Sequence, residues 1–156
     1  MNQSHSSLEL IQLNFPENYQ IRLKQTEGKW FIFCLIRKKW FVYTPEEWVR
    51  QHILHFLIEE KKYSSSNIAL EKIIPITGMQ KRSDIVCYQQ ENPFLMVECK
   101  APSIKITQET FDQIARYNLL TKAKYLMVSN GLQHYYCQID YENQHYFFLP
   151  ELPIYP

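Results

Sequence analysis

An acidic and a basic side chain, Glu98 and Lys100, stand two residues apart at the end of the apolar run 93–97. The run predicts a buried strand, and side chains alternate between the faces of a strand, so both charges point the same way. Taken alone, such a pair is more often a solvated ion pair. Beside a second acid it could help to bind a metal and stabilise charge on a phosphate.

The second acid is Asp84, near the start of an upstream apolar segment, 83–88. A polar connector that contains proline separates the two segments and predicts a hairpin. The expected cross-strand pairs are Tyr88 with Phe94, Val86 with Met96 and Asp84 with Glu98. Directly opposed residues have Cβ atoms about 4.5–5.5 Å apart. Two carboxylates that close repel each other, and a divalent metal with oxygen ligands is the usual solution.

Size and composition fit one domain, because 156 residues with 46% hydrophobic content can bury a proper core. We expect a strand extension over 1–43, a core over 44–140 and a C-terminal strand and tail over 141–156. The formal net charge of +1 is not the surplus of a protein that binds nucleic acid by electrostatics alone. A metal site would supply part of the missing positive charge.

The cysteine pattern favours a cytoplasmic protein. The four cysteines are widely spaced in apolar runs without a C-x-x-C pair, which predicts reduced, buried thiols instead of a zinc site or disulfides. His52 and His55 are three apart on an expected helix, where packing is a more common role than metal binding. The polar start lacks a signal peptide, and no apolar run approaches the roughly 20 residues that span a membrane.

The first third predicts an antiparallel meander with strands at 19–23, 30–36 and 40–43. Its aromatic residues stand beside the cations of 37–39. They could form a nucleic-acid surface, although aromatic strands more often belong to the core.

Thr44 and Pro45 predict the start of a helix that runs to about Lys62, with Glu47 completing a capping box. One apolar stripe is expected to be buried: Trp48, Val49, Ile53, Phe56 and Leu57. The later elements are a strand over 68–74 stopped by Pro75 and Gly78, the hairpin, a helix over 107–120, strands at 124–129 and 132–139 joined by Asn130-Gly131, and a last strand at 146–149.

The order from residue 45 to residue 129 is helix, three strands, helix and strand. Together with Asp84, the triplet Glu98-Cys99-Lys100 and the run Gln113-Ile114-Ala115-Arg116-Tyr117, it resembles the restriction-endonuclease-like PD-(D/E)XK nuclease core. More narrowly, segments 82–86, 97–102 and 111–118 are similar to the N-terminal nuclease region of type I restriction enzyme R subunits and their short stand-alone bacterial relatives. The resemblance implies an α/β fold: an αβββαβ core with a mixed central sheet flanked by helices, plus the N-terminal meander.

The resemblance also implies roles for individual residues. Asp84 and Glu98 match metal-binding acids, the backbone carbonyl of Cys99 matches a further ligand, and Lys100 matches the catalytic lysine. Glu47 matches an acid on the first core helix, so capping and metal binding are both open for it. The residues expected to contact nucleic acid are Gln113, Tyr117, Arg116 and Lys105. Ser83 departs from the family pattern, since many members have proline there.

The implied activity is hydrolysis of DNA phosphodiester bonds with Mg²⁺ or Mn²⁺, in restriction, defence or DNA processing. A bound divalent ion can activate a water and neutralise the oxygens around the phosphorus. The alternative is a non-catalytic module of the same fold that binds nucleic acid or forms a complex. RNA stays open as a substrate, and a homodimer or partner subunit is expected, with no membrane.

Overall fold

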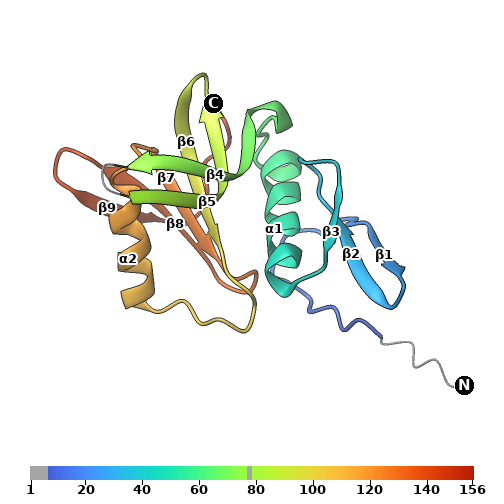
Figure 1. Cartoon of the computed structure of the whole chain (residues 1–156). Helices are drawn as coiled ribbons and strands as arrows, with labels where there is room; N and C mark the ends of the chain where they lie inside the picture. Colours follow the sequence, from blue (N-terminus) through green and yellow to red (C-terminus); the bar gives the residue numbers. More distant parts are fainter. Residues whose placement is uncertain (1–6, 77–78) are drawn as a thin grey trace, which may run out of the picture.

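The computed structural model describes residues 7–76 and 79–156, and the side chains of 7–73 and 82–156. It contains a three-stranded antiparallel sheet and a six-stranded mixed sheet, with α1 between them (Figure 1). The small sheet is formed by β1 (Leu23–Thr26), β2 (Lys29–Phe33) and β3 (Trp40–Val42). This confirms the expected fold class and the N-terminal meander.

The six-stranded sheet has the order β4-β5-β6-β7-β8-β9, in which β6 and β7 are parallel and the other pairs antiparallel. Its parallel pair is joined through α2, as a parallel connection requires a crossover. The bounds are β4 (Ile68–Ile76), β5 (Met79–Gln89), β6 (Asn92–Cys99), β7 (Tyr125–Ser129), β8 (His134–Asp140) and β9 (His145–Leu149), with helices α1 (Pro45–His55) and α2 (Gln108–Asn118).

The two faces of this sheet carry separate cores because side chains alternate along each strand. Ile85, Leu95 and Val97 pack on the α1 side. Val86 and Met96 pack on the α2 side, with other residues of that core. The cysteines of the chain, Cys34, Cys87, Cys99 and Cys137, are all free and buried, as expected.

The helix start at Thr44 is confirmed, since its Oγ1 accepts the Glu47 N–H at 3.0 Å. The Glu47 carboxylate, however, binds Arg37 and Arg50 and does not reciprocate the cap. After α1, one π-helical turn, η1 (Phe56–Glu60), continues the helix nearly to its expected end. The predicted apolar stripe of α1 and η1 is buried.

The predicted first strand at 19–23 is wrong. Glu27 and Gly28 both have positive φ, of 52° and 78°, and form a tight turn that pairs Thr26 with Lys29. This two-residue turn fixes the register of the hairpin, so the strand begins at Leu23 and runs through polar residues.

The central hairpin is confirmed at Val86 and Met96, which are paired. Tyr88 pairs with Pro93 and not with Phe94, because a bulge between Cys87 and Tyr88 shifts the register. The ladder ends at the pair Ile85 and Val97, so the predicted pair of Asp84 with Glu98 lies one step beyond it.

Further boundaries also differ from the sequence-based expectation. β2 ends at Phe33 and not at 36, and α2 ends at Asn118 and not at 120. β4 continues through Pro75 to Ile76, and the expected stop at Gly78 lies outside the described residues. β8 begins at His134 and not at 132, because the Asn130 side chain accepts the N–H groups of Leu132 and Gln133 and holds them in a turn. No helix among the described residues is long and apolar enough to cross a membrane.

Candidate active site

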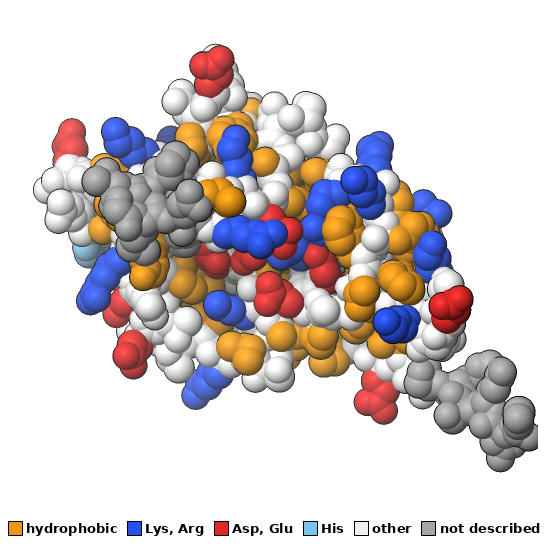
Figure 2. All heavy atoms as spheres, viewed as in Figure 1, with side chains coloured by type: hydrophobic (Ala, Val, Ile, Leu, Met, Phe, Trp, Pro, Cys, Tyr) orange, Lys and Arg blue, Asp and Glu red, His pale blue; other side chains and the backbone are white. Residues whose placement is uncertain are grey.

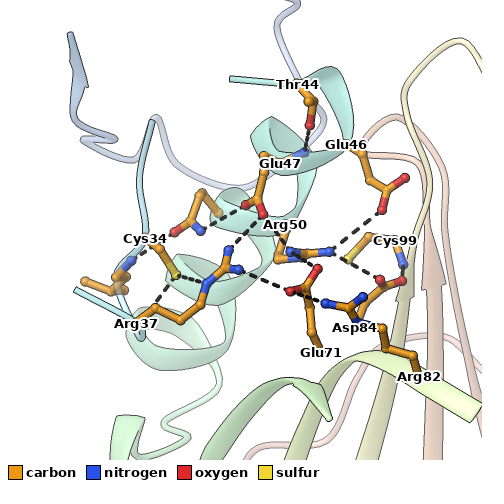
Figure 3. A network of polar contacts seen from close by, with 12 residues as sticks. Cys34, Arg37, Thr44, Glu46, Glu47, Arg50, Glu71, Arg82, Asp84 and Cys99 are labelled. Carbon is orange, nitrogen blue, oxygen red and sulfur yellow. Dashed lines mark hydrogen bonds and ion pairs between the residues drawn. The ribbon is translucent and has the colours of Figure 1, made fainter. Parts of the chain in front are cut away.

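The guanidinium of Arg50 lies at the centre of four carboxylates, which we call the acid cluster: Glu46, Glu47, Glu71 and Asp84 (Figure 3). Arg50 comes from the middle of α1, and its side chain is only 5% exposed. Nη1 lies 2.6 Å from Glu47 and 3.4 Å from Glu71. Nη2 lies 3.3 Å from Asp84 and 3.7 Å from Glu46. One buried cation therefore connects α1 with β4 and β5.

Other side chains support the cluster from outside. Arg37, in the β2–β3 loop, contacts Glu47 at 2.8 Å and Glu71 at 3.4 Å. Arg82 contacts Glu71 at 2.8 Å from the solvent side. Glu47 also accepts from the Gln51 amide at 3.3 Å, so its two oxygens are both bonded.

Asp84 joins this cluster to the end of β6. Its Oδ1 faces Arg50, and its Oδ2 accepts the backbone N–H of Cys99 at 2.8 Å. This hydrogen bond fixes the Asp84 side chain against the backbone between Glu98 and Lys100. It lies beyond the last backbone pair of β5 and β6.

Glu98 and Lys100 lie at this same end of the sheet. Glu98 is 9% exposed, and Lys100 is half-buried with its backbone N–H donated to Ser129 at 2.8 Å. Burial raises the pKa of Glu46, and Asp84 raises it further, while Arg50 and Lys100 oppose the shift. Lys100 therefore acts electrostatically on the acid cluster.

The charge states of the cluster follow from these contacts. Burial acts to lower the pKa of Arg50, but the carboxylates of Glu47, Asp84 and Glu71 outweigh it and raise the pKa. Burial acts to raise the pKa of Glu71, but Arg50, Arg82 and Arg37 outweigh it and lower the pKa. Mutual attraction keeps the buried Arg50 and the partly exposed Glu71 both ionised.

The acid cluster borders a cleft of about 600 Å³. Its walls come from the β2–β3 loop, β3, the first turns of α1, β4 and the β6–α2 loop, and include Glu46, Glu47 and Glu71. Figure 2 shows acidic side chains near the middle of this face with basic side chains beside them. A ligand in the cleft would therefore contact both acidic and basic side chains.

The residues predicted on α2 lie elsewhere. Gln113, Arg116 and Tyr117 line a separate hollow of about 890 Å³ along the outer side of that helix. Among the described residues, the two hollows share no lining residue. Lys105 is exposed in the loop before α2 and lines neither of them. The structure thus brings Asp84, Glu47 and 98–100 to one region and keeps the α2 residues out of the cleft.

This region contains the types of donor atom that a divalent cation takes. Carboxylate and carbonyl oxygens are the ligands that Mg²⁺ and Mn²⁺ take. Over residues 7–76 and 79–156, however, no three His, Cys, Asp or Glu side chains are grouped closely enough to hold a metal. In this structure the acids surround the guanidinium of Arg50, a positive charge that belongs to the chain itself.

Residues 45–153 match the family model of the type I restriction enzyme R protein N terminus. The chain belongs to this family. No curated protein and no solved structure matches the chain. The family match contains the whole acid cluster, Glu98 and Lys100, whereas the meander β1–β3 lies before it. The resemblance seen in the sequence is confirmed, and the R protein family makes this a restriction-related, nuclease-like domain.

The sequence held a signal for Arg50 that was missed. Arg50, Gln51 and His52 interrupt the apolar stripe of α1, yet all three are buried. A long cation three residues after Glu47 and four after Glu46, on a helix with no continuous polar face, indicates a buried ion pair. Glu71 gave a weaker signal, as a single acid within an apolar strand.

Proposed function

We propose that this R protein N-terminal domain is a metal-dependent nuclease that hydrolyses DNA phosphodiester bonds in restriction or defence. The observation that carries the proposal is the hydrogen bond from the Cys99 backbone N–H to Asp84. It fixes one acid directly against the segment that holds Glu98 and Lys100. Family membership supports the same reading.

Asp84, Glu98 and the Cys99 carbonyl would hold Mg²⁺ or Mn²⁺, with Glu47 as a nearby further acid. When bound, such an ion makes a water nucleophilic at neutral pH and neutralises the phosphate oxygens. The Lys100 ammonium would bind a phosphate oxygen and stabilise the charge that develops on it. Arg50 would keep the carboxylates together before a metal binds, and its charge opposes the uptake of a second cation.

Cleavage assays test this proposal. Purified protein should be incubated with plasmid, single-stranded DNA and RNA in Mg²⁺, in Mn²⁺ and in EDTA. We expect DNA cleavage with either metal, none in EDTA, and loss of cleavage in Asp84→Asn and in Lys100→Ala. Glu91→Gln, at an exposed turn, and Lys122→Ala, at another exposed position, are the matched controls that should cut normally. Normal cutting by Asp84→Asn would refute the assigned site.

A second function has one observation in its favour. Because Arg50 already lies at the centre of the acid cluster, the same fold could serve as a non-catalytic module that binds nucleic acid beside a partner subunit or a second copy. That module would retain DNA in EDTA and cut nothing in any metal. The assay above therefore separates the two functions.

A further inference from the structure

The meander has one buried face and one open face. Ile32 is fully buried, and its paired neighbours Leu23 and Phe41 pack with it against the core. The residues between them point the other way. We call these the outer face of the meander: Arg22, Lys24, Phe31, Phe33, Trp40 and Val42.

The outer face combines aromatic rings with cations. The Arg22 guanidinium carbon lies 4.6 Å from the centre of the Phe33 ring and 5.2 Å from that of Trp40. The Lys24 ammonium lies 4.4 Å from the centre of the Trp40 ring. Both cations are exposed, and Val42 is 58% exposed at the end of the same face. The rings thus form a half-open platform with charges standing over it.

Charge is concentrated on this small sheet. Residues 20–43 contain six Lys or Arg and one acid, a net charge of +5. The whole chain carries +1, so the remainder carries −4. Lys29, Lys38 and Lys39 are exposed at the turns of the meander (Figure 2 shows basic and hydrophobic side chains interleaved where β1–β3 lie). The meander therefore carries a positive electrostatic potential that the net charge of the whole chain does not indicate.

We propose that the outer face of the meander binds single-stranded nucleic acid. Bases stack on the rings of Phe33 and Trp40 in place of the exposed side chains of Arg22 and Lys24, which turn from the rings to pair with the phosphates. An open sheet face that offers aromatic rings between cations suits unpaired bases, because a duplex keeps its base faces covered. The meander precedes the residues that match the family model, so the match does not account for this surface.

The position of the surface connects it to the acid cluster. Val42 belongs to the outer face and also lines the cleft that contains Glu46 and Glu47. A strand held on the meander would therefore run toward that cleft. This part of the inference rests on the proposed function, whereas binding itself does not.

Binding is measured in EDTA, so that it is independent of cleavage. The probe is a fluorescein-labelled oligothymidylate of about 15 nucleotides, within the site sizes known for such platforms. Fluorescence anisotropy should show Trp40→Ala and Phe33→Ala binding about tenfold more weakly, since base stacking has effects of this order. Trp40→Phe, which keeps a ring, should retain most of the affinity. Phe148→Ala, an aromatic residue 52% exposed on β9, is the matched control and should bind normally.

The salt dependence tests the cations separately. For single strands, the negative slope of log K against log salt becomes shallower by about 0.7 for each lost phosphate contact. The double variant Arg22→Ala, Lys24→Ala should make the slope shallower by about 1.4, whereas Lys122→Ala should not change it. Unchanged affinity in Trp40→Ala and Phe33→Ala, or tighter binding of the matching duplex by the wild type, would overturn the proposal. Failure to cleave in Mg²⁺ would leave it intact and refute only the proposed function.

Discussion

The protein places arginine in two opposite environments. Arg50 is buried and forms ion pairs with four carboxylates. Arg22 is exposed above aromatic rings, in a segment with six basic residues and one acid. The first cation is compensated within the chain, so it contributes to the folded state. Within the part of the chain that the structure describes, no carboxylate pairs with the second, so it is available to a ligand. Charge balance, more than residue type, separates the two roles.

Of the changes that test this comparison, the removal of Arg50 should lower the free energy of unfolding the most. Arg50→Ala leaves the acid cluster without its central cation, and breaking a buried pair typically costs about 3–5 kcal/mol. Urea denaturation measures the loss. Arg82→Ala removes a partner of the same Glu71 from a 64% exposed position and should cost at most about 1 kcal/mol. Equal effects of the two variants would show that burial does not set the value of these ion pairs.

A milder change at Arg50 tests whether a metal can take its place. Arg50→Gln removes the charge, so Mn²⁺ should bind this variant more tightly than the wild type. Metal at a hundredfold excess over Kd stabilises the folded state by about 2.7 kcal/mol. Calorimetric titration and melting curves with and without Mn²⁺ measure the effect. The added change Asp84→Asn should abolish it, and equal Mn²⁺ affinity of wild type and Arg50→Gln would contradict the idea.

Glu47 distinguishes capping from charge compensation. The cap uses its backbone N–H, which Glu47→Gln keeps, whereas the substitution removes the ionic contacts with Arg37 and Arg50. Hydrogen bonds to charged groups contribute about 1.5–3 kcal/mol, so a loss in this range is expected in EDTA. Thermal and urea unfolding measure it. An unchanged stability would mean that Glu47 only starts the helix.

The smallest effect concerns the half-buried imidazole of His134, which should stay uncharged at neutral pH. Burial lowers the pKa of His134 from 6.5, although its bond to Asn14 opposes the shift. Because Nε2 donates to the Asn14 carbonyl, Nδ1 accepts from the Ser129 hydroxyl at 2.7 Å. The unfolded state binds the proton more readily, so stability should fall as the pH drops below about 6.5. His134→Gln should flatten that slope in unfolding curves from pH 7.5 to 5, whereas oligothymidylate binding through Arg22 and Lys24 should lack this dependence.

The sequence predicted the elements whose signals are local. Thr44 and Thr107 marked the two helix starts, and the pairing of Val86 with Met96 followed from counting back along the two strands from the connector. The pairing of Tyr88 failed because a bulge adds a residue that no periodic pattern reveals. The meeting of Asp84 with the Cys99 backbone follows the predicted hairpin, but its bond to Arg50 depends on tertiary packing of α1 against β5. The separation of Gln113 and Tyr117 from the cleft depends on the packing of α2 against the opposite face of the sheet.

The short connection between the three-stranded sheet and α1 has a mechanical consequence. Only Tyr43 and Thr44 separate β3 from α1, and both are tied: the Tyr43 N–H donates to Trp30 on β2, and the Thr44 hydroxyl accepts from Glu47. A hinge needs residues whose backbone angles can change. In this connection the hydrogen bonds of Tyr43 and Thr44 restrict such a change. Tension on the meander would therefore pass as a rigid-body pull to the first turn of α1.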